Sequence, residues 1–402
     1  SSWTRKRRGF PARPTAVLDC ANPQPLSDAI HRFLVTAPSG LVDPLARELE
    51  ALGAGAVSID HSGCRVRGPL SFAYRICMHS RLASRVLMPL VELVADDADG
   101  LVAKVAAFPW EDHMNVDGTL AVDFTGRGMG IDHTKYGAQR VKDGITDRFR
   151  ERFGRRPSVD TLAPDLRIQA HARGKACQLS IDLSGGGLHR RGYRTEAGIA
   201  PIRENLAAAM VLDADWRAIA DESDAVMIDP MCGAGTLVIE AALIACHRAP
   251  GLSRERFGFE LWKGHDAEVW AQIVAEAEAQ SITPRRIVAW GYDEDASVLA
   301  LAQANAERAG VGTAVRFAVS RCAEVTRPPK ARRGVVVTRV TAQHDHVRRE
   351  HALARSIHAR PWCRGAHLIR RVGRHGDTER AGCLVEGGGV GAVGKLAVDV
   401  LV

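Results

Sequence analysis

Short apolar runs along residues 33–195 predict an alternation of strands and helices. Two amphipathic helices each show one apolar face, formed by Leu45, Leu49 and Leu52 in the first and by Val141, Ile145 and Phe149 in the second. The segment AVSIDHSGCRVRG alternates like two strands around a His-Ser-Gly turn, and RIQAHARGKACQLSIDLSG like a hairpin around an Arg-Gly-Lys turn. Strands and helices of this size predict a small α+β unit.

A different pattern begins near Ala200. Residues Ala225–Ile228 form an apolar run typical of a buried parallel strand, and Leu237–Ala245 is an apolar helix. Between them lies the glycine-rich turn Asp229-Pro-Met-Cys-Gly-Ala-Gly-Thr236. Downstream, RRIVAWGYD is a second strand that ends in Asp293 and leads into another helix. This strand–turn–helix arrangement predicts a Rossmann-like fold with a ligand at the carboxyl ends of its strands.

The composition indicates a soluble globular protein, with 46% hydrophobic and 25% charged residues among 402. We find neither an apolar run of about 18 residues nor a signal-peptide pattern, and we therefore expect no membrane span and a cytoplasmic location. The nine cysteines include no Cys-x-x-Cys pair, which favours free thiols in a reducing compartment and no metal site. The length predicts two or three domains.

The net charge of +7 comes from the two ends of the chain, because residues 1–14 and 339–402 each contribute +5 and the part between them is slightly acidic. Only local basic clusters can therefore indicate nucleic-acid binding. One such cluster runs from Gly126 to Arg156, and HRRGYR at residues 189–194 places arginines around an aromatic residue. Interleaved arginine and tyrosine suit phosphates and a stacking base, whereas a solvated helix face is the alternative interpretation.

The residues of the turn distinguish between cofactors. A P-loop would need Gly-Lys-Ser or Gly-Lys-Thr, and a dinucleotide fingerprint would need glycine where Val238 stands. The turn also opens with Asp229, an acid that would repel a pyrophosphate and attract a cationic or zwitterionic ligand. S-adenosylmethionine carries an ammonium and a sulfonium group, and the acid at Asp293 suits the two ribose hydroxyls, with a helix N-cap as its alternative role.

Several long motifs resemble one enzyme family in the order in which they occur. DPMCGAGTLVIEAALIA, RFGFELWKGHD and GYDEDASVLALAQANAERAGV resemble the UPF0020-type methyltransferase domain. FLVTAPSGLVDPLARELEALGA, HTKYGAQRVKDGITDRFRERFGRRPSVD and SIDLSGGGLHRRGYR resemble the THUMP-containing front half of the same enzymes. The family is the bacterial 23S ribosomal RNA large subunit methyltransferase K/L, specifically its L half, over roughly residues 33–338.

The resemblance implies a domain order, a reaction and site residues. The domains would be a basic disordered arm (1–32), a ferredoxin-like part (33–75), a THUMP RNA-binding domain (76–198) and a Rossmann-like class I methyltransferase domain (199–338). The reaction would be methyl transfer from S-adenosylmethionine to the N2 amine of a guanine in 23S RNA. The cofactor would contact Asp229, Pro230, Cys232, Gly233, Gly235 and Asp293. The RNA would contact Lys135, Arg140, Lys142, Arg190, Arg191 and Arg194.

The sequence departs from the family after the fourth expected strand, RRGVVVT at residues 332–338. The family's Asn-Pro-Pro-Tyr motif, which would orient the target amine and stack on the flipped base, is absent, so the catalytic residues stay unassigned. Residues 339–402 are rich in Arg, His and Gly with little periodicity, and we predict that they do not belong to the fold and supply no fifth strand. A reading-frame shift after residue 338 is our preferred explanation, and a specialised basic tail is the alternative.

Three functions follow from these observations. The first is an RNA methyltransferase, and the second is an RNA-binding THUMP protein without methyl transfer, favoured by the missing motif. The third is another Rossmann enzyme, such as a dehydrogenase, that would bind NADH in the same turn.

Overall fold

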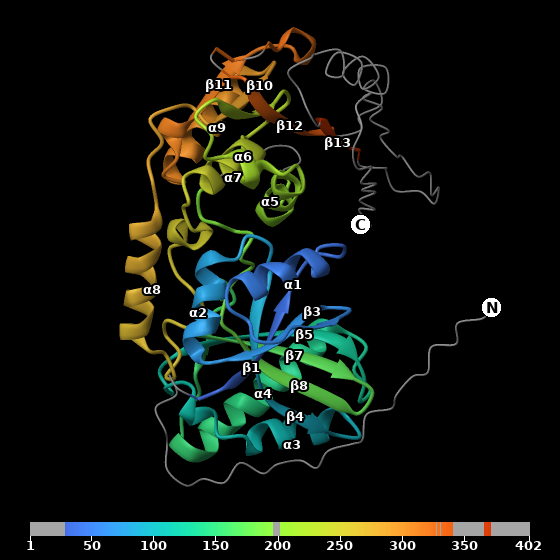
Figure 1. Cartoon of the computed structure of the whole chain (residues 1–402). Helices are drawn as coiled ribbons and strands as arrows, with labels where there is room; N and C mark the ends of the chain where they lie inside the picture. The colour runs from blue at the N-terminus through green and yellow to red at the C-terminus, as the bar shows by residue number, and fades with distance from the viewer. Residues whose placement is uncertain (1–28, 196–201, 327, 330, 341–365, 371–402) are drawn as a thin grey trace, which may run out of the picture.

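The computed structural model describes residues 29–195, 202–326, 328, 329, 331–340 and 366–370. They form two halves that lie one above the other in Figure 1, each built on its own sheet. The N-terminal half is drawn in blue and green, and the C-terminal half in yellow-green to orange.

The N-terminal half is an eight-stranded sheet of order β2-β3-β1-β4-β8-β7-β5-β6. Its strands are β1 (His31–Thr36), β2 (Ser58–Asp60), β3 (Gly63–Gly68), β4 (Arg85–Val94), β5 (Thr119–Arg127), β6 (Ser158–Val159), β7 (Leu166–Arg173) and β8 (Ala176–Asp182). The expected ferredoxin-like and THUMP parts share this one sheet, because β4 pairs antiparallel with both β1 and β8. The two predicted hairpins are confirmed as β2–β3 and β7–β8.

Four helices pack on this sheet: α1 (Val42–Ala51), α2 (Leu70–His79), α3 (Ala98–Ala107) and α4 (Thr134–Phe153). The predicted apolar faces are confirmed at Leu45 and Leu49 in α1 and at Val141, Ile145 and Phe149 in α4, all fully buried. Gly144 lets α3 and α4 approach closely, since a Cβ there would lie 2.6 Å from the Cβ of Val105. The α4 helix ends at Gly154, whose φ of 67° is the left-handed conformation favoured after a helix.

The C-terminal half is a parallel sheet of order β11-β10-β9-β12-β13. Its strands are β9 (Ala225–Asp229), β10 (Ala289–Asp293), β11 (Val315–Val319), β12 (Arg333–Val340) and β13 (Ala366–Arg370). Its helices are α5 (Glu204–Asp213), α6 (Trp216–Ile219), α7 (Thr236–Ala245), α8 (Ala267–Gln280) and α9 (Ala296–Arg308). Three short 3-10 helices in the described part of this half are η2 (Pro250–Ser253), η3 (Gly312–Ala314) and η4 (Cys322–Glu324), and another, η1 (Trp110–Asp112), lies in the N-terminal half. The order is that of a doubly wound α/β sheet, as predicted.

One prediction for the tail is wrong. Residues 366–370 form β13, a fifth strand that pairs in parallel with β12 from Val336↔Ala366 to Val340↔Arg370. A strand at the edge of a sheet has unpaired N–H and C=O groups, and an extended segment can satisfy them through its main chain whatever its side chains are. Periodicity of the side chains therefore does not reveal such a strand. The predictions for the rest of the tail and for residues 1–28 lie outside the described residues.

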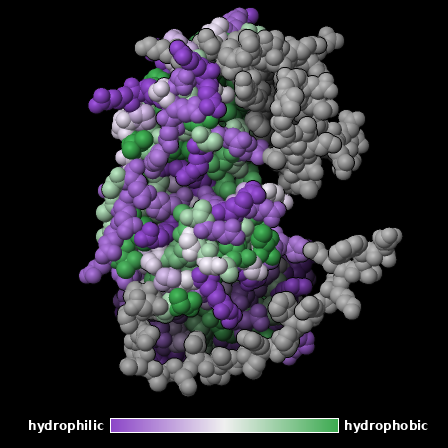
Figure 2. All heavy atoms as spheres, viewed as in Figure 1, coloured by the Kyte–Doolittle hydropathy of each residue, from purple (hydrophilic) through white to green (hydrophobic). Residues whose placement is uncertain are grey.

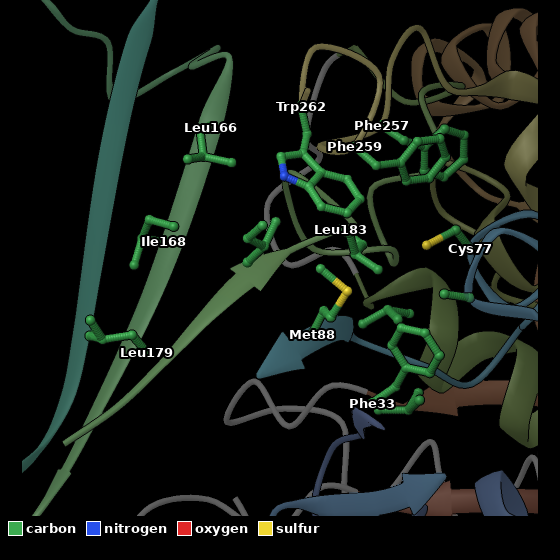
Figure 3. Packing of buried hydrophobic residues seen from close by; sticks show 14 of the residues in the cluster. Phe33, Cys77, Met88, Leu166, Ile168, Leu179, Leu183, Phe257, Phe259 and Trp262 are labelled. Atoms are coloured by element: carbon green, nitrogen blue, oxygen red, sulfur yellow. The ribbon is translucent and has the colours of Figure 1, made fainter. Parts of the chain in front are cut away.

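The segment between α7 and β10 packs onto the N-terminal half. Phe257, Phe259 and Trp262 belong to the same buried cluster as Leu183, which directly follows β8, and as residues of the first sheet, and Figure 3 shows these rings beside Leu183. The α8 helix, with Ile273 in that cluster, contacts α2 along one side of the molecule (Figure 1). A part of the expected methyltransferase domain thus completes the core of the other half and fixes the two halves to each other.

A buried polar network also joins the halves. The Arg191 guanidinium, 1% exposed, donates to the carbonyl oxygens of Leu188 and Arg81 at 3.0 and 2.5 Å. Its Nε lies 3.6 Å from Oε1 of Glu240 on α7, which also accepts the Tyr193 hydroxyl at 3.1 Å. Burial next to Glu240 raises the pKa of Tyr193 well above its ordinary value, so the phenol stays a hydrogen-bond donor.

This network predicts a large loss of stability on Glu240→Ala. The substitution would leave the buried Arg191 guanidinium without its counter-charge, and we expect the free energy of unfolding to fall by about 3 kcal/mol. Urea unfolding followed by circular dichroism measures the change. The matched control is Glu222→Ala, which removes an exposed ion pair with Arg333 and should cost at most about 1 kcal/mol. Equal losses for the two variants would contradict the assignment.

Candidate functional site

The loop from Asp229 to Thr236 connects the carboxyl end of the buried strand β9 to α7. Gly233 and Gly235 have φ angles of 51° and 81°, in the left-handed region that favours glycine. A Cβ on Gly235 would also lie 3.0 Å from both Ala302 and Phe317, so a side chain there meets α9 and β11. A Cβ on Gly233 would meet nothing within 4 Å, so the main chain at this position faces open space.

Asp293, at the carboxyl end of β10, closes the loop from the neighbouring strand. Its Oδ2 accepts the N–H of Gly233 at 3.0 Å, and its Oδ1 accepts the N–H of Asp295 at 3.1 Å. The N-cap of α9 is Asp295, whose carboxylate accepts from Ser297, and this excludes the N-cap role that the sequence left open for Asp293. Each carboxylate oxygen has two lone pairs, so Asp293 retains acceptors for a ligand.

Asp229 is buried below the loop. Burial raises the pKa of its carboxyl group to about 7, and the nearby Asp293 charge acts in the same direction. The Thr338 hydroxyl on β12 and the Met231 N–H, 3.1 Å from Oδ1, act in the opposite direction. Within the described part of the chain, no Lys, Arg or His forms a salt bridge with Asp229, so a cationic ligand would supply its missing counter-charge.

Pro230 and Cys232 lie in the same loop, next to Asp229 and Asp293. Pro230 is buried directly after Asp229, and Cys232 donates its N–H to the Tyr292 carbonyl at 2.8 Å. Burial and the adjacent acids raise the pKa of the Cys232 thiol well above its ordinary value. The protonated thiol is therefore a packing group and not a nucleophile. The structure thus brings together all six residues predicted to bind the cofactor.

The residues predicted to contact RNA do not behave alike. Lys135 and Arg190 are exposed, whereas Arg140 forms ion pairs with Asp99 and Asp143, and Lys142 with Asp143. These four lie on α4 and on the segment after β8.

Two of the predicted arginines are internal. Arg194 is mostly buried, pairing with Glu204 at 2.7 Å and donating to the Ile202 carbonyl. The prediction for Arg191 is wrong, because its guanidinium is enclosed between the halves and bonded to carbonyl oxygens. A charged side chain in a basic motif suggests a surface, and sequence alone does not show that buried acceptors await it.

Asn305 on α9 belongs to none of the predicted motifs, yet its side-chain Nδ2 donates to the Ala234 carbonyl in the loop at 3.1 Å. Asn305 lies on the buried face of this helix, between Ala302 and Ala309. A polar residue at an apolar helical position is a signal that the sequence contained.

The described residues meet neither the requirements of a metal site nor those of a membrane-spanning helix. There, His, Cys, Asp and Glu nowhere gather in a group of three or more able to hold a metal ion. None of the helices that the structure describes has both the length and the apolar character needed to cross a bilayer.

Comparison with known proteins defines the class of the two halves. The sequence matches profiles described as an RlmL ferredoxin-like domain over residues 32–87, a THUMP domain over 95–182 and an RMKL-like methyltransferase domain over 191–340. Two solved structures have the same fold over 82% of this chain. A predicted N6-adenine-specific DNA methylase from Listeria monocytogenes is 29% identical with a TM-score of 0.70, over 85% of its own chain. A putative methyltransferase, SMU.472, complexed with SAH, is 24% identical with a TM-score of 0.69, over 86% of its chain.

The fold and the loop define a class I methyltransferase domain attached to a THUMP-containing half. Curated relatives identify the family within this class. The ribosomal RNA large subunit methyltransferase K/L of Syntrophotalea carbinolica is 49% identical over 292 residues, covering 72% of this chain and 41% of the relative. That of Pseudomonas paraeruginosa is 44% identical over 312 residues, covering 77% and 43%. The chain belongs to the ribosomal RNA large subunit methyltransferase K/L family and spans about two fifths of the length of these relatives.

The pKa of Asp229 gives a prediction for the ligand-free protein. Its carboxyl group is neutral in the fold below pH 7 but ionises near pH 4 in the unfolded chain, so its contribution to stability decreases as the pH rises from about 4 to about 7. Asp229→Asn removes this effect. Urea unfolding should therefore show the variant gaining stability relative to the unmodified protein between pH 4 and 7, by at most about 1.4 kcal/mol per pH unit, with no further gain above pH 7. A difference that does not change with pH would contradict the raised pKa.

Proposed function

We propose that this chain is an S-adenosylmethionine-dependent methyltransferase that modifies the N2 amine of a guanine in 23S ribosomal RNA. One observation carries the cofactor assignment. A buried acid without a salt bridge among the described residues, Asp229, opens a glycine-rich loop, and a second acid, Asp293, lies at the end of the next strand. The substrate assignment rests on membership of the K/L family.

The residues of the loop fit this cofactor. Asp229 lies where an ammonium or sulfonium charge would compensate its carboxylate, and the open space above Gly233 leaves room for a ligand against the main chain. Asp293 offers its remaining lone pairs to ribose hydroxyls, as acids at this strand end do in related folds. When bound, the cofactor would supply a methyl group on a positively charged sulfur, so that an amine attacking the methyl carbon forms the N–C bond while the S–C bond breaks and S-adenosylhomocysteine leaves. The neighbour complexed with SAH, the demethylated form of the cofactor, supports the proposal.

The N-terminal half is proposed to hold the RNA. Lys135 and Arg190 are the two predicted contacts that are exposed and form no salt bridge among the described residues, which leaves their charges available to phosphates. Hydrophilic residues cover much of the visible face of both halves, with small hydrophobic areas between them (Figure 2). Contacts of this kind position the RNA, and specificity for one base comes from the site at the strand ends.

A second function, RNA and cofactor binding without methyl transfer, is favoured by the sequence after Thr338. An exocyclic guanine amine is a weak nucleophile, because its lone pair is delocalised into the ring. The family motif that would accept its hydrogens and orient it is absent from the printed sequence.

Cofactor binding is tested at Asp293. Asp293→Ala removes the proposed ribose acceptors and the bond to Gly233, and we expect the dissociation constant for S-adenosylhomocysteine to rise at least tenfold by isothermal titration calorimetry. The matched control is Glu294→Ala, which removes the adjacent exposed acid and should leave binding unchanged. Binding of NADH in place of S-adenosylhomocysteine would instead support a dehydrogenase.

Methyl transfer separates the two functions. Unmodified 23S RNA incubated with the protein and labelled cofactor should yield N2-methylguanosine after nuclease digestion. Binding of both ligands without any labelled nucleoside would support the second function and overturn the first.

RNA binding is tested by reversing two charges. The double variant Lys135→Glu and Arg190→Glu should weaken binding of a 23S RNA fragment and reduce the slope of log K against log salt by about 2, because each phosphate contact contributes close to one. Arg65→Glu serves as a control with the same change of charge per site, since Arg65 already pairs with Asp60. If the control has the same effect per charge, the two residues do not form a specific contact.

A further inference from the structure

The loop from Asp229 to Thr236 is called the cofactor loop below. A chain of hydrogen bonds runs from this loop to Tyr193, which lies in the segment between the two halves. The carbonyl oxygen of Tyr193 accepts from Arg308 Nε at 2.8 Å. The same guanidinium donates through Nη2 to Asn305 Oδ1 at 2.5 Å. Asn305 Nδ2 then donates to the carbonyl oxygen of Ala234 at 3.1 Å. Tyr193, far away in the sequence, is thus linked to Ala234 in the loop through Arg308 and Asn305 on α9.

The Tyr193 end of this run is firmly held. Its side chain is buried and its hydroxyl is bonded to Glu240 on α7, while Arg191, two residues before it, is bonded to carbonyl oxygens and Arg194, directly after it, to Glu204. The carbonyl of Tyr193 is therefore a fixed acceptor. Arg308 spans two acceptors at once because its planar guanidinium holds several donor nitrogens in a fixed geometry, whereas a lysine has a single donor nitrogen.

The Ala234 end needs such support. Ala234 lies between Gly233 and Gly235, the two loop residues in the left-handed conformation. Glycines allow this conformation but also allow many others, so the loop has more conformational freedom to lose on ordering than one built from other residues. The bond from Asn305 fixes the carbonyl between them and thereby limits this freedom.

The burial of Asn305 points to the same role. Its side chain is 2% exposed on a helix face otherwise made of Ala302, Ala306 and Ala309. A buried amide is unfavourable unless both its oxygen and its nitrogen are bonded, and here they are bonded to Arg308 and to Ala234 respectively.

We propose that Asn305 and Arg308 are positioning residues that hold the cofactor loop in its binding conformation and tie it to the segment joining the two halves. The proposal rests on the proposed function of the loop. Neither residue touches the reacting atoms; both act through the main chain of Ala234.

The decisive variant is Asn305→Asp. It keeps the size of the side chain and the acceptor for Arg308, and it replaces the donor to Ala234 with an oxygen that repels the carbonyl. We expect the dissociation constant for S-adenosylhomocysteine to rise about tenfold, or about 1.4 kcal/mol, while the far-ultraviolet circular dichroism spectrum is retained. Arg308→Lys, at a surface position, should raise it about threefold. Gln303→Ala removes a side-chain bond to Glu307 on the same helix and should change nothing.

Hydrogen exchange in the ligand-free protein separates this proposal from the proposed function. In the unmodified protein the N–H groups of Cys232, Gly233 and Gly235 are all hydrogen-bonded, so they should exchange slowly, and they should exchange faster in Asn305→Asp and Arg308→Lys. Faster exchange in a protein that binds no S-adenosylhomocysteine would sink the proposed function and leave the positioning role standing. Folded variants with unchanged exchange and unchanged affinity would overturn the positioning role, and Arg308→Lys keeps this test available if Asn305→Asp fails to fold.

Discussion

The hydrogen bond from the Gly233 N–H to Asp293 is the contact on which the candidate site depends. It joins the loop after β9 to the end of β10, so the glycine turn and the second acid become one structure. The parallel sheet makes this possible, because it places the carboxyl ends of neighbouring strands at the same edge. The lone pairs that Asp293 does not use for the loop remain available as hydrogen-bond acceptors. One carboxylate therefore shapes the loop and completes the site.

The boundary between the two halves does not follow the order of the sequence. Phe257, Phe259 and Trp262 follow the cofactor loop in the chain, yet they pack in the core of the N-terminal half. Apolar packing and the Arg191 network together leave little freedom between the halves. The candidate site at the strand ends is thereby held in a fixed position relative to the N-terminal half.

Sequence patterns predicted the helix faces and the glycine turn because these features depend on residues close together in the chain. The faces of α1 and α4 follow from helical spacing, and the glycine turn follows from the main-chain conformations that glycine permits. Arg191 was misjudged because its acceptors, the carbonyls of Leu188 and Arg81, are main-chain groups whose positions no side-chain pattern encodes. The strand β13 was missed for the same reason, since it pairs with β12 through the main chain. Asn305 is the intermediate case, in which the polar residue was visible on an apolar face but its partner was not.

The charge of the candidate site favours one kind of ligand over another. Asp229 lies buried near a second carboxylate, and this arrangement holds its pKa near 7 in the ligand-free protein. A phosphate-bearing ligand would add negative charge beside two acids, whereas a ligand with an ammonium or sulfonium group would lower the pKa of Asp229 and bind its ionised form. Because binding and ionisation are linked, the affinity for such a cation should be greatest where Asp229 is already ionised, above pH 7. The same glycine turn with a different first residue would suit a different cofactor, and the position of one acid thus separates this class of site from the dinucleotide sites that share its fold.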